Sequence, residues 1–314
     1  MVTAVPLELP NARLDAEVNE GLAGVEEAHH VASPIPPAQP EDPDELIVPA
    51  REGTLRVLRA AREAGVRRVV LTSSFAAVGY SPKAIRDYTE DDWTDPDTPG
   101  LPPYPRSKAI AERAAWDYIG QHPGDIELVV LNPTFIIGPA LVTALRSSLV
   151  AIKAIAEGTM PALPRQRFGV ADVRDVADAH LKAAATPDAV GKRYLLLADG
   201  PTITWLGLAE AIRDHLGAAG ANVTLREAPG EDPSLLKARV MTTRRRYGLA
   251  RRSGCRPSHA AALSRVTCQA RAGSRGIGPG GTRYGNPHAG GRREPGGTSA
   301  AGLTPGGAPP PAEV

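Results

Sequence analysis

The chain has 314 residues, 42% of them hydrophobic, and a formal net charge of +1, which allows one large or two modest domains with a packed core. Its N-terminus lacks a basic segment followed by an apolar run, and no run of about 18 apolar residues occurs anywhere. Neither a secretory leader nor a membrane-spanning helix is therefore predicted, and we expect a cytoplasmic protein.

The chain begins with residues that give little sign of regular structure. Residues 1–24 are predicted to be a poorly ordered N-terminal segment, and residues 25–32 a short strand with several charged positions. His29 and His30 are the only histidines with a paired spacing, and we interpret them as part of this strand. No metal site is therefore predicted.

A helix and a buried strand are predicted next. Residues 50–64 have leucine and alanine at helical spacing among charged residues, and Gly65 follows as a C-terminal cap. The apolar run over residues 66–72 is typical of a buried strand, which ends at Ser73 and Ser74.

The most informative segment runs from Tyr104 to Lys108, near the start of a helix predicted over residues 104–119. Side chains four residues apart leave the same face of a helix. A phenol with an ordinary pKa near 10 is a poor acid–base catalyst at neutral pH, but an adjacent ammonium group favours the phenolate and lowers that pKa. The pair predicts a proton-transfer site, and a surface tyrosine and lysine on an amphipathic helix is the alternative.

Further elements extend to residue 216. A strand over residues 126–131 ends at Asn132, and it is followed by helices over 141–157 and 172–185, a strand over 193–198, and a helix over 205–216 with Thr204 as its N-cap. The later elements are expected to form a smaller lobe that shapes a substrate cleft.

Strands and helices alternate along the chain, which predicts an α/β fold with a parallel sheet and covering helices. Ligands of such folds bind at the carboxyl ends of the strands. The residues expected at such ends are Ser73, Ser74, Asn132, Pro133 and Thr134. Because the Tyr104 helix connects the two strands concerned, these side chains are expected to share a site with Tyr104 and Lys108.

The last segment, residues 242–314, differs in composition from the rest. It contains 12 arginines, no lysine, two glutamates and 15 of the 32 glycines, so it carries +10 while residues 1–241 carry −9. We predict a disordered Arg/Gly/Pro-rich tail. It holds Cys255 and Cys268, so no disulfide is expected in the folded part. Its few aromatic residues and lack of Arg-Gly-Gly repeats give no reason to expect a nucleic-acid partner.

Several stretches in order resemble the extended short-chain dehydrogenase/reductase family, within it the dihydroflavonol reductase and cinnamoyl-CoA reductase branch with its epimerase/dehydratase-like relatives. The matching stretches are His30-Val31-Ala32-Ser33-Pro34, Gly53-Thr54, Val69 to Ser74, Glu90-Asp91-Asp92-Trp93, Tyr104 to Lys108, Asn132-Pro133-Thr134 and Gly138-Pro139. The resemblance covers roughly residues 20–230.

This resemblance implies a Ser-Tyr-Lys mechanism. Ser74 falls where the family has a serine that hydrogen-bonds the substrate oxygen, with Ser73 as the alternative. Tyr104 would give a proton to a carbonyl oxygen or remove it from an alcohol, while Lys108 would lower the tyrosine pKa and hold the nicotinamide ribose. The implied cofactor is NADP or NAD. The residues implied to contact it are Ala32, Ser33, Thr72, Ser73, Tyr104, Lys108, Pro133 and Thr134.

One feature of the family has no counterpart in this sequence. Relatives begin with an apolar strand and a Gly-x-x-Gly-x-x-Gly turn that brings backbone amides to the cofactor pyrophosphate. Before His30 the only glycines are Gly21 and Gly24. We therefore expect weak cofactor binding. The implied organisation is a truncated Rossmann-like domain over residues 25–140 and a substrate lobe, mixed with the last Rossmann elements, over 141–241.

The expected function is a nicotinamide-dependent oxidoreductase of the aldehyde or ketone reductase type, whose partner is a small carbonyl or alcohol compound. Phe75 follows the strand-end serines where dehydratases of this superfamily place an acid, which favours a reductase over a sugar dehydratase. The alternatives are a non-catalytic remnant or scaffold of the same fold, inactive without the phosphate loop, and a sugar-nucleotide epimerase-like enzyme.

Overall fold

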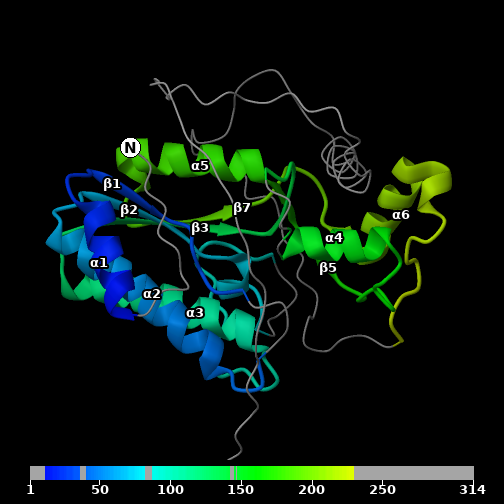
Figure 1. Cartoon of the computed structure of the whole chain (residues 1–314), viewed down its shortest axis with the longest axis horizontal. Helices are drawn as coiled ribbons and strands as arrows, with labels where there is room; N and C mark the ends of the chain where they lie inside the picture. The colour runs from blue at the N-terminus through cyan, green and yellow to red at the C-terminus, as the bar shows by residue number, and fades with distance from the viewer. Residues whose placement is uncertain (1–10, 36–39, 82–86, 142–144, 146, 230–314) are drawn as a thin grey trace, which may run out of the picture. The chain divides into compact units, whose positions relative to one another are not determined.

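The computed structural model describes residues 11–35, 40–81, 87–141, 145 and 147–229, without the side chains of 11–14. The tail predicted over residues 242–314 lies outside these ranges. A parallel sheet of order β1-β2-β3-β7 forms the centre (Figure 1). Its strands are β1 (Glu27–His30), β2 (Arg68–Thr72), β3 (Glu127–Pro133) and β7 (Arg193–Leu196).

Helices cover both faces of this sheet (Figure 1). On one face, α2 (Asp44–Glu63) and α3 (Pro103–Gln121) pack over Val69 of β2, and on the other, α5 (Val173–Ala185) packs over Val70. Neighbouring residues of a strand point to opposite faces, so a strand covered on both sides is apolar throughout. The α/β fold with a parallel sheet, predicted from the alternating pattern, is confirmed.

The N-terminal segment differs from its prediction. Residues 1–24 were expected to be poorly ordered, but α1 is a helix over Asn11–Leu22. It is held in place because Val18 is buried against Ala60 and Val57 of α2. A short amphipathic helix of this kind depends on tertiary contacts more than on its own helix propensity.

A second hydrophobic core lies in the segment for which the sequence predicts a substrate lobe. It contains Ile155, Leu163, Leu208 and Ile212, all of which are buried. The elements around it are β4 (Phe135–Ile137), α4 (Ser148–Ala156), β5 (Arg167–Phe168), β6 (Val170–Asp172), β8 (Ile203–Thr204) and α6 (Trp205–Leu216). Strands β4 and β6 pair in parallel, and β5 and β8 pair antiparallel. Short 3₁₀ turns occur at Phe75–Ala77 (η1), Pro187–Ala189 (η2) and Gly217–Gly220 (η3).

Two helices have bounds that differ by six or more residues from those predicted. The helix predicted over residues 50–64 begins earlier, at Asp44, because Pro49 lies inside α2 instead of ending it. Pro49 is in the second turn, where it has no N–H to donate to the Glu45 carbonyl, and the helix continues through it. The helix predicted over residues 141–157 is shorter, with α4 spanning Ser148–Ala156.

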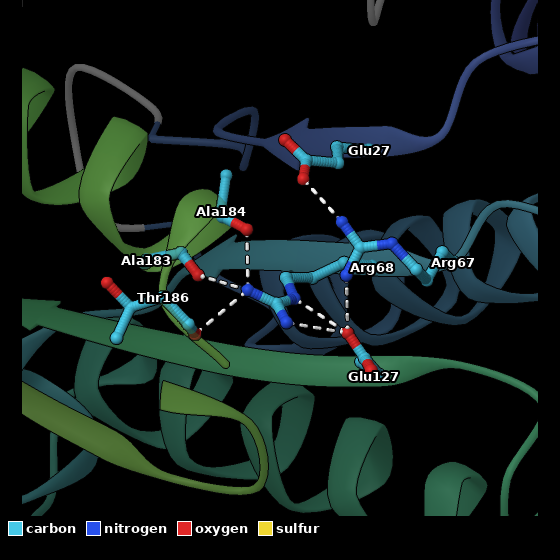
Figure 2. Close-up of polar contacts among 7 residues, drawn as sticks. All are labelled: Glu27, Arg67, Arg68, Glu127, Ala183, Ala184 and Thr186. Atoms are coloured by element: carbon cyan, nitrogen blue, oxygen red, sulfur yellow. Dashed lines mark hydrogen bonds and ion pairs between the residues drawn. The ribbon is translucent and has the colours of Figure 1, made fainter. Parts of the chain in front are cut away.

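Two consecutive arginines, Arg67 and Arg68, make polar contacts at the amino ends of the strands (Figure 2). Arg68 is 2% exposed and donates to the carbonyls of Ala184 (2.5 Å) and Thr186 (2.9 Å) at the end of α5, and to Glu127 Oε2 (2.8 Å) of β3. Arg67 instead joins the surface carboxylates of Glu127 and Glu27. Arg68 therefore supplies donors that the last carbonyls of α5 lack.

This difference between neighbours predicts unequal stability effects. Arg68→Met should lower the free energy of unfolding by roughly 2–4 kcal/mol. It leaves the carbonyls of Ala184 and Thr186 without the Arg68 donor and removes the buried cation that pairs with Glu127. Arg67→Met, the matched control, should cost less than about 1 kcal/mol, because exposed ion pairs contribute little. Urea unfolding followed by circular dichroism measures both. Equal losses in the two variants would contradict the role given to Arg68.

Candidate active site

The carboxyl ends of β1, β2 and β3 meet at one edge of the sheet, beside the first turn of α3. This helix begins at Pro103, with Pro102 as its N-cap. Proline suits the first helical position because its fixed φ matches the helix and its missing N–H would have no helical partner there. The first turn of α3 therefore carries Tyr104, and Lys108 follows one turn later, where it is 6% exposed.

Ser74, Tyr104 and Lys108 lie together. Ser74 is the N-cap of η1, where its Oγ accepts from the Ala76 N–H at 3.1 Å, and its side chain is near enough to Tyr104 to lower the pKa of that phenol. The Lys108 Nζ atom lies 5.8 Å from the centre of the Tyr104 ring. The structure therefore brings together the three side chains that the sequence resemblance singled out as catalytic.

Burial controls the ionisation of this group. Burial raises the pKa of Tyr104 above 10.0, and the hydrogen bond from Ser74 opposes that rise. The pKa of Lys108 is lowered to about 8 by burial, against the charge of Glu112, which raises it. On balance the Tyr104 pKa is therefore raised and not lowered as expected from the sequence, because burial is the largest influence on it.

Two further titratable residues border the site. Burial, with Tyr104 as a neighbouring charge, raises the pKa of Tyr80 to about 12. Burial and the positive charge of Lys108 lower the pKa of His30 to about 4, so His30 is neutral at physiological pH. Both side chains can therefore act as neutral hydrogen-bonding groups beside Tyr104 and Lys108.

The remaining residues expected at the cofactor are spread over the strand ends. The hydroxyl of Thr72 lies 2.9 Å from His180 Nε2 of α5, Ser73 donates to Glu112 Oε2 at 2.5 Å, and Thr134 donates to the Leu196 carbonyl at 3.0 Å. Pro133 is the buried last residue of β3, whereas Ala32 is exposed and Ser33 half-buried after β1. The bond of Ser73 to Glu112 leaves Ser74 as the serine at Tyr104.

Sequence reasoning missed the residues behind this group. Glu112 is 1% exposed, and its Oε1 accepts from Arg193 Nε at 2.5 Å. Asn132, noted in the sequence only as a strand-end residue, donates to Glu112 Oε2 at 2.7 Å. The spacing held a signal for Glu112, which follows Lys108 by four residues and so shares its helix face. Arg193 had no such signal, because it comes from β7, 81 positions away.

The side chains of His29 and His30 point to opposite faces of the sheet, because they are consecutive residues of β1. His29 lies against His180, with 3.3 Å between their Nδ1 atoms, while His30 is buried near Lys108. Within the described ranges, no three His, Cys, Asp or Glu side chains gather as a metal ion would require. The helices in the same ranges include none with the length and apolarity to cross a membrane.

The donor set fits one end of a nicotinamide cofactor. The Tyr104 hydroxyl, Lys108 amine and Ser74 hydroxyl offer donors and acceptors suited to a ribose and a reacting oxygen at the strand ends. The pyrophosphate end is not matched at α2, whose first turn carries Asp44 and Glu45 and would repel an anion. The described residues thus fit the ribose and nicotinamide part of the cofactor.

Comparison with known proteins identifies the family of this chain. The model of the NAD dependent epimerase/dehydratase family matches residues 15–196. Cinnamoyl-CoA reductase 1 of Petunia hybrida is 36% identical over 184 residues, which cover 57% of this chain and 53% of that protein. A putative NADPH-dependent methylglyoxal reductase of Candida albicans is 34% identical over 191 residues, 56% of each chain.

Solved structures share the fold. The Gre2–NADPH complex from Candida albicans is 25% identical, has a TM-score of 0.68, and matches over 85% of this chain and 82% of its own. Yeast methylglyoxal/isovaleraldehyde reductase Gre2, also complexed with NADPH, has a TM-score of 0.67 at 22% identity, over 82% of this chain and 79% of its own. The chain spans about half the length of the curated relatives it matches. By its sequence match and its fold, this chain belongs to the NAD dependent epimerase/dehydratase family.

Proposed function

We propose that this chain is an NAD(P)-dependent oxidoreductase that interconverts a small aldehyde or ketone and its alcohol. The observation that supports this most strongly is that the buried Lys108 amine lies 5.8 Å from the centre of the Tyr104 ring, beside Ser74 at the carboxyl end of β2. Two hydroxyl groups that face one substrate oxygen can both donate to it as negative charge develops there.

Each member of this group has a distinct task in the proposal. Ser74 positions the carbonyl oxygen, and Tyr104 gives that oxygen its proton. Because burial keeps the Tyr104 pKa above 10.0, this side chain is protonated at neutral pH and ready to act as an acid. The Lys108 ammonium favours the developing phenolate and holds the ribose by hydrogen bonds. A bound reduced nicotinamide would supply hydride to the carbonyl carbon.

The cofactor and substrate class rest on the relatives. NADPH is the first cofactor to test, because the Candida reductase named above is NADPH-dependent and the Gre2 structures contain it. Small aldehydes and ketones, methylglyoxal among them, are the first substrates to test, because these relatives are described as methylglyoxal or isovaleraldehyde reductases. Affinity for the cofactor is expected to be weak, so NADPH should be supplied at about millimolar concentration.

Removal of the proposed acid tests this assignment. Tyr104→Phe should lower kcat for NADPH-dependent carbonyl reduction by about 100-fold or more, because a positioned acid contributes roughly 10²–10⁴-fold. Consumption of NADPH followed by absorbance measures the rate. Tyr118→Phe, a half-buried tyrosine farther along α3, is the matched control and should keep the native rate. Native activity in Tyr104→Phe would contradict the assignment.

The ionisation of Lys108 predicts a pH dependence. Its pKa of about 8 means that the ammonium is present below that pH and is lost as pH rises through it, while Tyr104, with a pKa above 10.0, stays protonated. The reduction rate should therefore fall with one inflection near pH 8. Lys108→Arg keeps its charge throughout this range, so its residual activity should show no such inflection. An identical inflection in both proteins would exclude Lys108 as its source.

A further inference from the structure

A buried carboxylate lies directly behind the candidate catalytic group. Glu112 of α3 is 1% exposed. Its oxygens accept from Arg193 Nε at 2.5 Å, Ser73 Oγ at 2.5 Å, Asn132 Nδ2 at 2.7 Å and Trp116 Nε1 at 3.4 Å. A charge taken out of water is tolerated only when it is paired and well supplied with hydrogen bonds. Four donors therefore stabilise the Glu112 carboxylate in its buried position.

This carboxylate reaches Ser74 by two routes. Ser73, whose hydroxyl bonds Glu112, is the preceding residue in the chain. Asn132, whose amide bonds Glu112, also donates to the Ser74 carbonyl at 3.1 Å. The backbone of Ser74 is therefore held by two groups that share the Glu112 carboxylate as acceptor, and this restricts the position of the Ser74 hydroxyl beside Tyr104.

The same carboxylate also acts on Lys108. Glu112 follows Lys108 by four residues on α3, so the two side chains share a helix face. Burial lowers the pKa of Lys108 to about 8, and the charge of Glu112 works against that fall. Glu112 therefore helps Lys108 to keep its proton at neutral pH.

Arg193 anchors the network from β7. Its guanidinium lies 3.6 Å from the centre of the Trp93 ring, and it donates to the carbonyls of Glu90 and Asp92, each at 2.8 Å. The groups that face Glu112 are Lys108 and Trp116 from α3, Ser73 from the end of β2, Asn132 from β3 and Arg193 from β7. His30 of β1 is near enough to Lys108 for the lysine charge to lower the pKa of the imidazole. The carboxylate thus joins three strands to α3.

We propose that Glu112 is a positioning residue of this site, which holds Ser74 in place through Ser73 and Asn132 and holds the Lys108 ammonium beside Tyr104. The proposal rests on the proposed function for its effect on rate. It goes beyond that function because Glu112 touches neither substrate nor cofactor and acts through its neighbours.

Glu112→Gln tests the proposal, because it keeps the shape of the side chain and removes its charge. We expect kcat to fall about 10- to 100-fold, since small displacements of reacting groups have effects of this size. The inflection of the pH profile should also move below about 8, by about one unit or more. Asp117→Asn neutralises an exposed carboxylate of the same helix and should change neither quantity.

A second readout does not need activity. In protein labelled with ¹³C-lysine, the Lys108 signal is assigned by its loss in Lys108→Arg, and its titration midpoint should be lower in Glu112→Gln than in the native chain. A lower midpoint in protein without carbonyl reductase activity would support the network and reject the proposed function. An active Glu112→Gln variant with native kcat, pH profile and titration midpoint would overturn the proposal.

Asn132→Ala covers the case in which Glu112→Gln does not fold. This variant keeps the carboxylate but removes the donor shared with the Ser74 carbonyl. We expect kcat to fall at least about 10-fold while the Lys108 midpoint stays at the native value. A native kcat would overturn the positioning role. A shifted midpoint would show that Asn132 also affects the ionisation of Lys108, and would contradict the proposal that Glu112 acts on Ser74 and on Lys108 by separate routes.

Discussion

Burial of one face of α3 is the constraint on which the rest of the site depends. Tyr104, Lys108 and Glu112 occupy that face at intervals of four residues, and a buried environment disfavours the charged form of each kind of group. It raises the pKa of Tyr104 and lowers that of Lys108 to about 8. The ion pair of Glu112 with Arg193, backed by Ser73 and Asn132, is what allows charge to persist there.

The parts of the fold that could be predicted from sequence are those governed by local pattern. The apolar runs of β2 and β3 and the periodicity of α2 and α3 were recognisable, and N-capping by Thr204 was correctly expected because its hydroxyl does accept from the Gly207 N–H. Helix α1 was missed because its order comes from packing on α2, which no local pattern reveals. Short pairs such as β5 with β8 are equally dependent on distant partners.

The features of the candidate site also divide into those that local sequence pattern predicts and those that depend on the whole fold. Proximity of Tyr104 and Lys108 follows from helical spacing, and proximity of Ser74 to Tyr104 follows from the order of strands and helix, so the sequence could predict both. The direction of the Tyr104 pKa could not be predicted, since it depends on burial by the whole fold. Nor could the pairing of Glu112 with Arg193, because the two residues lie far apart in the chain. The proposed acid Tyr104, its neighbour Ser74 and the Lys108 amine all lie among the described residues, so their chemistry can be tested in this chain.

Hydride transfer to a carbonyl carbon is the reaction that we propose for the strand-end group around Tyr104. It is tested most directly by incubating the full chain with NADPH deuterated at the transferring position of the nicotinamide and a small aldehyde or ketone, and by mass spectrometry of the product. We expect an alcohol that carries the deuterium on its carbinol carbon. Recovery of unchanged carbonyl compound from a chain that demonstrably binds the cofactor would contradict it.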